Sequence, residues 1–141
     1  FYAGMALFGI THIIYMFCFS NMMMQSGPFM HTSQVSIAFY TFCVIYAFSL
    51  IFVAFMVYKK DKHFCIATII YVILICFSLG SMYLCAAVLG GKLCLAAIGI
   101  TFFWISDMLI LIRETKKDTS LIRKLIWVFY PIGQMLIVFS I

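Results

Sequence analysis

The chain has 141 residues, of which 67% are hydrophobic and only 9% are charged, with a formal net charge of +5. Soluble domains average about 45–50% apolar and about 25% charged residues, so this composition cannot supply a water-facing surface. The sequence therefore predicts an integral membrane protein. The basic residues lie in short loops between apolar runs, which is typical of membrane topology signals and excludes nucleic-acid binding.

Five apolar runs are long enough, or nearly long enough, to cross a bilayer as helices, since a helical span needs about 20 residues. A β-barrel would instead alternate polar and apolar residues along short strands. We therefore expect an all-α, polytopic transmembrane helix bundle in one domain, with spans over 1–19, 35–58, 64–89, 93–112 and 125–141. The chain starts with Phe inside an apolar run, so we also expect it to be a fragment without its N-terminal spans.

The segments between these runs carry alternating numbers of Lys and Arg residues. In chain order they contain none in 20–34, three in 59–63, one in 90–92 and five in 113–124. Basic loops stay preferentially on the cytosolic side of a membrane. The alternation therefore predicts that loops 59–63 and 113–124 face the cytosol, together with residue 1.

The six cysteines occur singly, within or at the edges of the apolar runs. There is no CxxC motif and no Cys/His cluster with the spacing of a zinc site. We interpret the cysteines as small packing residues, and the sequence supports neither a disulfide framework nor a metal site.

One carboxylate stands inside an expected span, in the stretch FFWISDMLIL. It is Asp107, about 9 Å from the cytosolic end of its helix at 1.5 Å per residue. A charged residue within a span costs about 2.5–3.5 kcal/mol on insertion scales, so such residues tend to face the bundle interior and to serve a function. The structural alternatives are a hydrogen bond to a neighbouring helix or a carboxylate that reaches toward the cytosolic surface.

Other polar side chains are expected close to the depth of Asp107. Tyr130 lies at nearly the same depth on the next span, Gln134 follows it by one helical turn, and His12 lies near the middle of the first span. We expect these side chains to meet in one layer. The alternatives are interhelical hydrogen bonds for His12 and Gln134 and an interfacial position for Tyr130. Ser106 is expected to bond back to its own helix.

Three motifs resemble the YhhN family of multi-pass membrane proteins, which includes the animal transmembrane lysoplasmalogenases. They are G-I-T-F-F-W-I-S-D-M-L (Gly99–Leu109), Y-P-I-G-Q-M-L-I (Tyr130–Ile137) and F-Y-A-G-M-A-L-F-G-I-T-H-I-I-Y (Phe1–Tyr15). The similarity runs through nearly the whole chain in order and spacing. It implies a larger bundle of about eight spans and, in a eukaryotic cell, the endoplasmic reticulum membrane. It also implies an earlier span with a Gly-Asp pair, which nothing here matches.

The resemblance implies hydrolysis of the vinyl ether bond of lysoplasmalogen to a fatty aldehyde and a glycerophospho head group. A vinyl ether must first be protonated on its β-carbon, so the reaction needs a carboxylic acid that is still protonated near neutral pH. Desolvation inside a bilayer favours that neutral form. Asp107 is therefore the leading candidate for the acid or cation stabiliser, and His12 for relaying a proton or holding the attacking water.

The remaining candidates would bind the lipid substrate. Tyr130, Gln134 and Ser106 would orient the acid or bind substrate oxygens, while basic residues at the cytosolic end would hold the head-group phosphate, namely Arg113, Lys117 and Lys124. The chemistry requires no cofactor. A small proton-coupled transporter or channel would also place Asp, His and Gln in a bundle core. An inactive family member with a structural role would share the motifs, and a fragment of a seven-helix receptor would share the aromatic richness.

Overall fold

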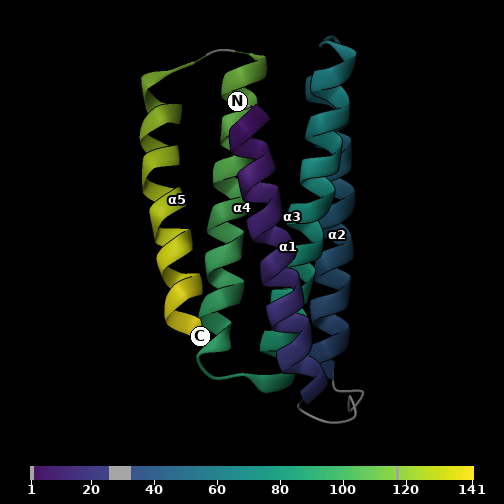
Figure 1. Cartoon of the computed structure of the whole chain (residues 1–141), viewed down its shortest axis with the longest axis vertical. Coiled ribbons are helices and arrows are strands. Elements are labelled where there is room, and N and C mark those ends of the chain that lie inside the picture. Colours follow the sequence, from purple (N-terminus) through teal and green to yellow (C-terminus); the bar gives the residue numbers. More distant parts are fainter. Residues whose placement is uncertain (1, 26–32, 117) are drawn as a thin grey trace.

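The computed structural model describes residues 2–25, 33–116 and 118–141, and these ranges form five α-helices. The helices are α1 (Tyr2–Gln25), α2 (Ser33–Val57), α3 (Lys62–Leu89), α4 (Leu93–Thr115) and α5 (Ser120–Ser140). They run alternately up and down in the bundle (Figure 1). All five are long and apolar enough to cross a membrane, which confirms the expected all-α bundle of five spans.

Two of the helices extend five or more residues beyond the expected spans. The first helix extends to Gln25 instead of ending at residue 19, because the apolar Met22-Met23-Met24 run continues it and methionine is a good helix former. The last helix begins at Ser120 instead of 125. Thr119 caps it by accepting a hydrogen bond from the Ile122 backbone N–H at 3.3 Å, so the helix starts inside the segment that had been expected to be a loop.

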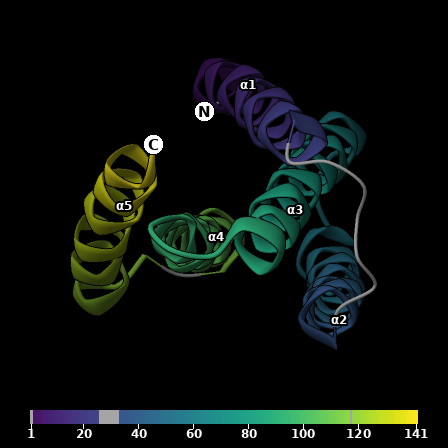
Figure 2. The same cartoon turned by 90° about the horizontal axis from the view of Figure 1, so that it is seen from below.

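Helix α3 lies at the centre of the arrangement, because it packs against α1, α2 and α4, while α4 also packs against α5 (Figure 2). Among the described residues, no Cα atom of α1 lies within 8 Å of a Cα atom of α4 or α5. The two terminal helices of the chain therefore approach each other only through side chains. This wider spacing leaves room for an interior site between α1 and the α4–α5 pair.

The α4–α5 pair is held at very close range by two glycines. A Cβ atom added at Gly99 would lie 2.7 Å from the Gly133 carbonyl oxygen, and one added at Gly133 would lie 2.8 Å from the Gly99 carbonyl oxygen. Small residues at helix crossings let backbones pack directly in a membrane. Asp107 lies two turns beyond Gly99 on α4, and Tyr130 lies one turn before Gly133 on α5. The glycine contact thus fixes these two helices, and with them the two polar residues, relative to each other.

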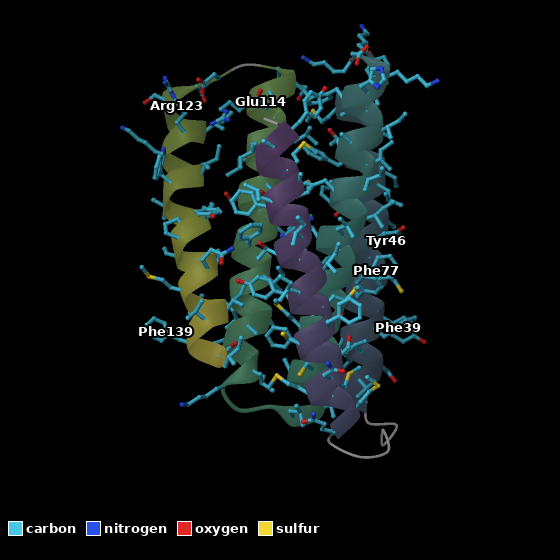
Figure 3. The ribbon with its side chains drawn as sticks, viewed as in Figure 1. Phe39, Tyr46, Phe77, Glu114, Arg123 and Phe139 are labelled. Atoms are coloured by element: carbon cyan, nitrogen blue, oxygen red, sulfur yellow. The ribbon has the colours of Figure 1, made fainter. Side chains whose placement is uncertain are left out.

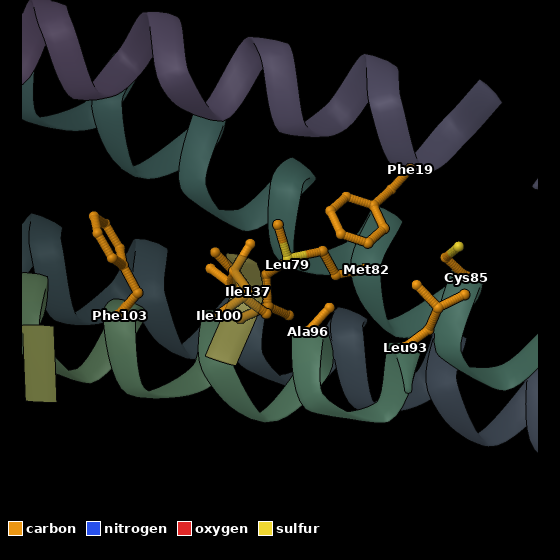
Figure 4. Close-up of a cluster of buried hydrophobic side chains, with 9 residues drawn as sticks. All are labelled: Phe19, Leu79, Met82, Cys85, Leu93, Ala96, Ile100, Phe103 and Ile137. Atoms are coloured by element: carbon orange, nitrogen blue, oxygen red, sulfur yellow. The ribbon is translucent and has the colours of Figure 1, made fainter. Parts of the chain in front are cut away.

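The buried core forms two clusters along the bundle. The larger joins α1, α3, α4 and α5 and consists of Phe19, Leu79, Met82, Cys85, Leu93, Ala96, Ile100, Phe103 and Ile137 (Figure 4). The smaller joins α2, α3 and α4 and consists of Val53, Val57, Val72, Cys76, Met108 and Leu111.

Large apolar side chains also cover the outside of the bundle, as expected of a surface that faces lipid. Phe139 is 72% exposed and Phe39 is 50% exposed. Figure 3 shows Glu114 and Arg123 at the end of the bundle where α1 begins, and Phe139 toward the other end. The two basic loops share that first end, because the Lys60 ammonium donates a hydrogen bond to the Glu114 carbonyl oxygen at 3.1 Å. The end of the bundle that carries the basic loops is thus polar, and the sides of the bundle are apolar.

Candidate functional site

Asp107 lies inside the bundle on α4, with 8% of its surface exposed. Its Oδ2 accepts a hydrogen bond from the Tyr71 hydroxyl on α3 at 3.2 Å. The carboxyl group is therefore held by a neighbouring helix rather than extended toward the end of the bundle.

Tyr71 is a site residue that the sequence did not reveal. Its span is apolar all round and contains several aromatic residues, so no local pattern distinguished this tyrosine or identified the face of α3 that meets Asp107. The one available signal was its position near the middle of a span, away from the interfacial belts where tyrosines are commonest.

A cavity of about 230 Å³ lies beside Asp107. Its walls come from α1, α3, α4 and α5, and they consist of Gly4, Met5, Phe8, Thr68, Tyr71, Val72, Asp107, Met108, Ile110, Leu111 and Tyr130. Four of these side chains carry oxygen atoms and the rest are apolar. The cavity is therefore mainly apolar, with Asp107 and three hydroxyl-bearing residues in its wall, of which the Thr68 hydroxyl oxygen is itself buried.

His12 is buried on α1, with 1% of its surface exposed. Neither ring nitrogen has a hydrogen-bond partner among the described residues. Its ring packs against Phe103, with ring centres 5.0 Å apart, and against Tyr71, with ring centres 6.3 Å apart. His12 thus packs by its ring against Tyr71, the residue whose hydroxyl bonds to Asp107.

Tyr130 and Gln134 occupy successive turns of α5. Tyr130 lines the Asp107 cavity, and its ring lies 5.4 Å from that of Phe103 and 5.6 Å from that of Phe8. The Gln134 Oε1 accepts a hydrogen bond from the Tyr15 hydroxyl on α1 at 3.1 Å, a contact that sequence reasoning did not foresee. Of the residues expected in one layer, Asp107 is paired with Tyr71 and Gln134 with Tyr15, and the His12 ring contacts both of these tyrosines.

Ser106 is buried, and its hydroxyl has no hydrogen-bond partner among the described residues. The expectation that it bonds back to its own helix was wrong. Such a bond is optional, because the carbonyl four residues earlier already accepts the backbone hydrogen bond of the helix.

The candidate phosphate-binding residues lie at the end of the bundle. Arg113 forms a salt bridge with Glu114, with Nη2 and Oε1 2.8 Å apart, so much of its charge is already balanced. Lys124 lies exposed in the first two turns of α5. Lys117 lies outside the described residues.

The described residues hold six free cysteines and no group of three or more His, Cys, Asp or Glu side chains that could bind a metal ion. The polar groups that the structure places in or beside the site are the carboxyl, the hydroxyls and the imidazole. A carboxyl group in apolar surroundings, hydrogen-bonded at one oxygen only, can exchange a proton with a bound molecule.

Five apolar helices with a carboxyl-lined cavity among them define a multi-pass membrane protein with a polar interior site. The family model of the YhhN family matches residues 1–141, so the chain belongs to the YhhN family, as its motifs had indicated. Comparisons with curated proteins and with solved structures give no match.

Proposed function

We propose that this protein is a membrane hydrolase that cleaves the vinyl ether bond of lysoplasmalogen, giving a fatty aldehyde and a glycerophospho head group. The proposal depends above all on one observation, the buried Asp107 carboxyl at the wall of a mainly apolar cavity. The motifs shared with the YhhN family, which includes lysoplasmalogenases, indicate the substrate.

The proposed reaction begins with transfer of a proton from Asp107 to the β-carbon of the vinyl ether. The electrons of the double bond form the new C–H bond, which leaves an oxocarbenium ion beside the carboxylate. Water then adds to the cation and loses a proton to Asp107, which regenerates the acid. The resulting hemiacetal collapses to the aldehyde, and its hydroxyl proton passes to the departing glycerol oxygen, so protons balance over the cycle.

Other residues would support this step from the positions described above. Tyr71 holds one carboxyl oxygen, so that the other is left to carry the proton. Tyr130 lines the same cavity and is proposed to bind the ether oxygen. His12 packs against the Tyr71 ring without lining the cavity, and it is proposed to hold the attacking water or relay its proton, because neither of its buried nitrogens has a hydrogen-bond partner among the described residues.

Residues farther from Asp107 have weaker support as substrate-binding groups. Gln134 lies one turn from Tyr130 and already accepts a bond from Tyr15, so its role in binding would be shared with that tyrosine. The buried, unpartnered Ser106 hydroxyl precedes Asp107 in the chain. Lys124, and to a lesser degree the paired Arg113, would attract the head-group phosphate at the end of the bundle that we propose faces the cytosol.

Aldehyde release from lysoplasmalogen by the full-length protein in membranes tests the proposal. Asp107→Asn should lower the rate by about 10²–10⁴-fold, the range that general acid–base catalysis contributes. Asp118→Asn provides the control, because Asp118 is a half-exposed loop carboxylate paired with Arg123. Equal rates for wild type and Asp107→Asn would exclude Asp107 as the acid. No aldehyde from a well-folded wild type would favour a transporter or an inactive family member.

A further inference from the structure

A second hollow lies at the surface of the bundle between α1 and α3, which pack side by side (Figure 2). It has a volume of about 340 Å³, and the proposed reaction does not yet use it. Its lining is hydrocarbon apart from Tyr2 and Tyr71, and Ile10 and Ile70 in that lining are each more than half exposed. Three of the lining residues are small, namely Ala6, Gly9 and Ala67. The hollow is therefore an apolar groove that opens toward lipid, and we call it the α1–α3 groove.

The α1–α3 groove runs along the two helices. On α1 its lining extends from Tyr2 to Ile13, which are about 16 Å apart at 1.5 Å per residue. That length is about half of the roughly 30 Å hydrocarbon core of a bilayer. Both helices begin at the end of the bundle that carries the basic loops. The groove therefore leads from that end toward the middle of the membrane, which is the direction in which a lipid chain extends from its head group.

The groove adjoins the Asp107 cavity, because Met5 and Tyr71 line both spaces. These two side chains form the partition between them. The Tyr71 hydroxyl is bonded to Asp107, so its ring is tied to α4. Met5 is the adaptable part of the partition, since methionine is unbranched and has three rotatable bonds. A rotation of the Met5 side chain would therefore connect the groove with the cavity and leave the hydrogen bond to Asp107 in place.

The chemistry of a vinyl ether places the start of the hydrocarbon chain at the reaction centre. The β-carbon that receives the proton is the second carbon of that chain, so the remaining methylene groups extend directly from the point of protonation. The Asp107 cavity, at about 230 Å³, is smaller than the roughly 300–1,000 Å³ of a typical small-molecule site. A long chain therefore has to leave the cavity, and the adjoining groove offers it apolar walls.

We propose that the α1–α3 groove binds the hydrocarbon chain of the vinyl ether lipid, and that the chain passes Met5 to reach the Asp107 cavity. This inference rests on the proposed function, since it extends the same site. Most of the chain stays at the lipid-facing surface of the bundle, so that only its first carbons leave the surrounding hydrocarbon. The groove would thereby align the lipid with the helices and hold its reactive bond at the level of Asp107.

Photochemical attachment to the full-length protein in membranes locates the chain directly. The probe is a saturated 1-alkyl lysolipid, which has no double bond to protonate, with a diazirine near the end of its chain. A phosphatidylcholine with the same diazirine in one acyl chain reports contact with ordinary bilayer lipid. The lysolipid should attach mainly to groove residues such as Ile10, Ile13 and Leu74, and an excess of unlabelled 1-alkyl lysolipid should suppress this attachment. The same distribution for both probes would overturn the inference, because it would mean that the groove holds bulk lipid only.

Two alanines of α1 provide a matched pair of variants. Ala6 lines the groove, whereas Ala3 is exposed on the same helix and lines neither the groove nor the cavity. Ala6→Leu fills space that the chain would occupy, so it should lower attachment of the lysolipid in the groove by about tenfold. Ala3→Leu should leave the attachment unchanged. Ala67→Leu, on the α3 wall, should repeat the effect of Ala6→Leu, and full attachment in both groove variants would refute the inference.

Aldehyde release separates this inference from the proposed hydrolysis. With a long-chain lysoplasmalogen, Ala6→Leu should raise KM by about tenfold, and with a short-chain homologue that ends before the groove it should change KM little. An equal change for both chain lengths would place the disturbance in the cavity and overturn the inference. Attachment in the groove without aldehyde release from wild type would refute the hydrolase proposal and leave the groove as a lipid-chain site. Aldehyde release without attachment in the groove would refute the groove alone.

Discussion

The hydroxyl of Tyr71 on α3 donates to Oδ2 of Asp107 on α4 at a distance of 3.2 Å. Because the phenol uses one carboxyl oxygen, a protonated Asp107 that accepts this bond on its carbonyl oxygen carries its proton on the other. Tyr71 thereby fixes both the rotation of the carboxyl group and the oxygen from which a proton leaves. Its proposed role is to position the acid.

Tyr71→Phe should lower kcat for aldehyde release by about 10²-fold and leave KM nearly unchanged, because misplacing a reacting group by about 1 Å has an effect of that size. Tyr83→Phe is the matched control. Tyr83 also forms a hydrogen bond between α3 and α4, with its hydroxyl 2.7 Å from Thr101 Oγ1, but it does not line the cavity. Equal losses in both variants would mean that Tyr71 supports the fold rather than the acid.

His12 allows activity and stability to be separated. Replacing a buried, unpartnered polar ring by an apolar one of similar shape is nearly neutral or stabilising, so His12→Phe should keep the Tm close to that of wild type. Aldehyde release should nevertheless fall by about 10²-fold or more if His12 handles the water proton. The exposed His63 at the start of α3 serves as the control, and His63→Ala should retain activity. Full activity in a stable His12→Phe protein would limit His12 to packing.

The glycine contact between α4 and α5 should be sensitive to a single methyl group. Gly99→Ala would place a carbon 2.7 Å from the Gly133 carbonyl oxygen, and backbone on both sides must move to relieve it. We expect a loss of about 1–3 kcal/mol, measured as a lower Tm in detergent. Gly4→Ala, whose added Cβ would have no heavy atom within 4 Å apart from its chain neighbours and its own helix backbone, should change the Tm little. A similar Tm for both variants would contradict the close contact.

The orientation of the bundle can be tested with single cysteines in a protein whose six native cysteines are replaced by serine. In sealed vesicles with the cytosolic face outward, a membrane-impermeant thiol reagent should label Lys60→Cys directly. It should label Lys92→Cys only after detergent is added, because that loop lies at the other end of the bundle. The opposite pattern would reverse the proposed orientation.

The sequence was sufficient to predict the fold class and the five spans, because the length of an apolar run is itself the physical requirement for crossing a bilayer. Asp107 was identified for a similar reason, since a lone carboxyl in such a run raises the free energy of membrane insertion whichever side of the helix it occupies. The two helix ends that lie beyond the expected spans depend on local features, a methionine run at one and the Thr119 cap at the other.

The partners of the polar residues could not be predicted in the same way. Tyr71, Tyr15 and Thr68 lie on helices that are apolar on every face, and a helix without a polar stripe does not show which side meets its neighbour. Contacts such as Tyr15 with Gln134 join residues 119 positions apart, so they arise from packing of the whole bundle and not from any spacing along the chain.

The direct backbone contact between Gly99 and Gly133 also fixes the position of α5 along α4. Sliding α5 by one turn along α4 would carry Tyr130 about 5.4 Å away from its place beside the Asp107 cavity. The crossing point prevents this displacement, because only two residues without side chains can meet there. In the proposed reaction, two glycines with no chemical role would therefore set the depth at which a lipid must present its reactive bond.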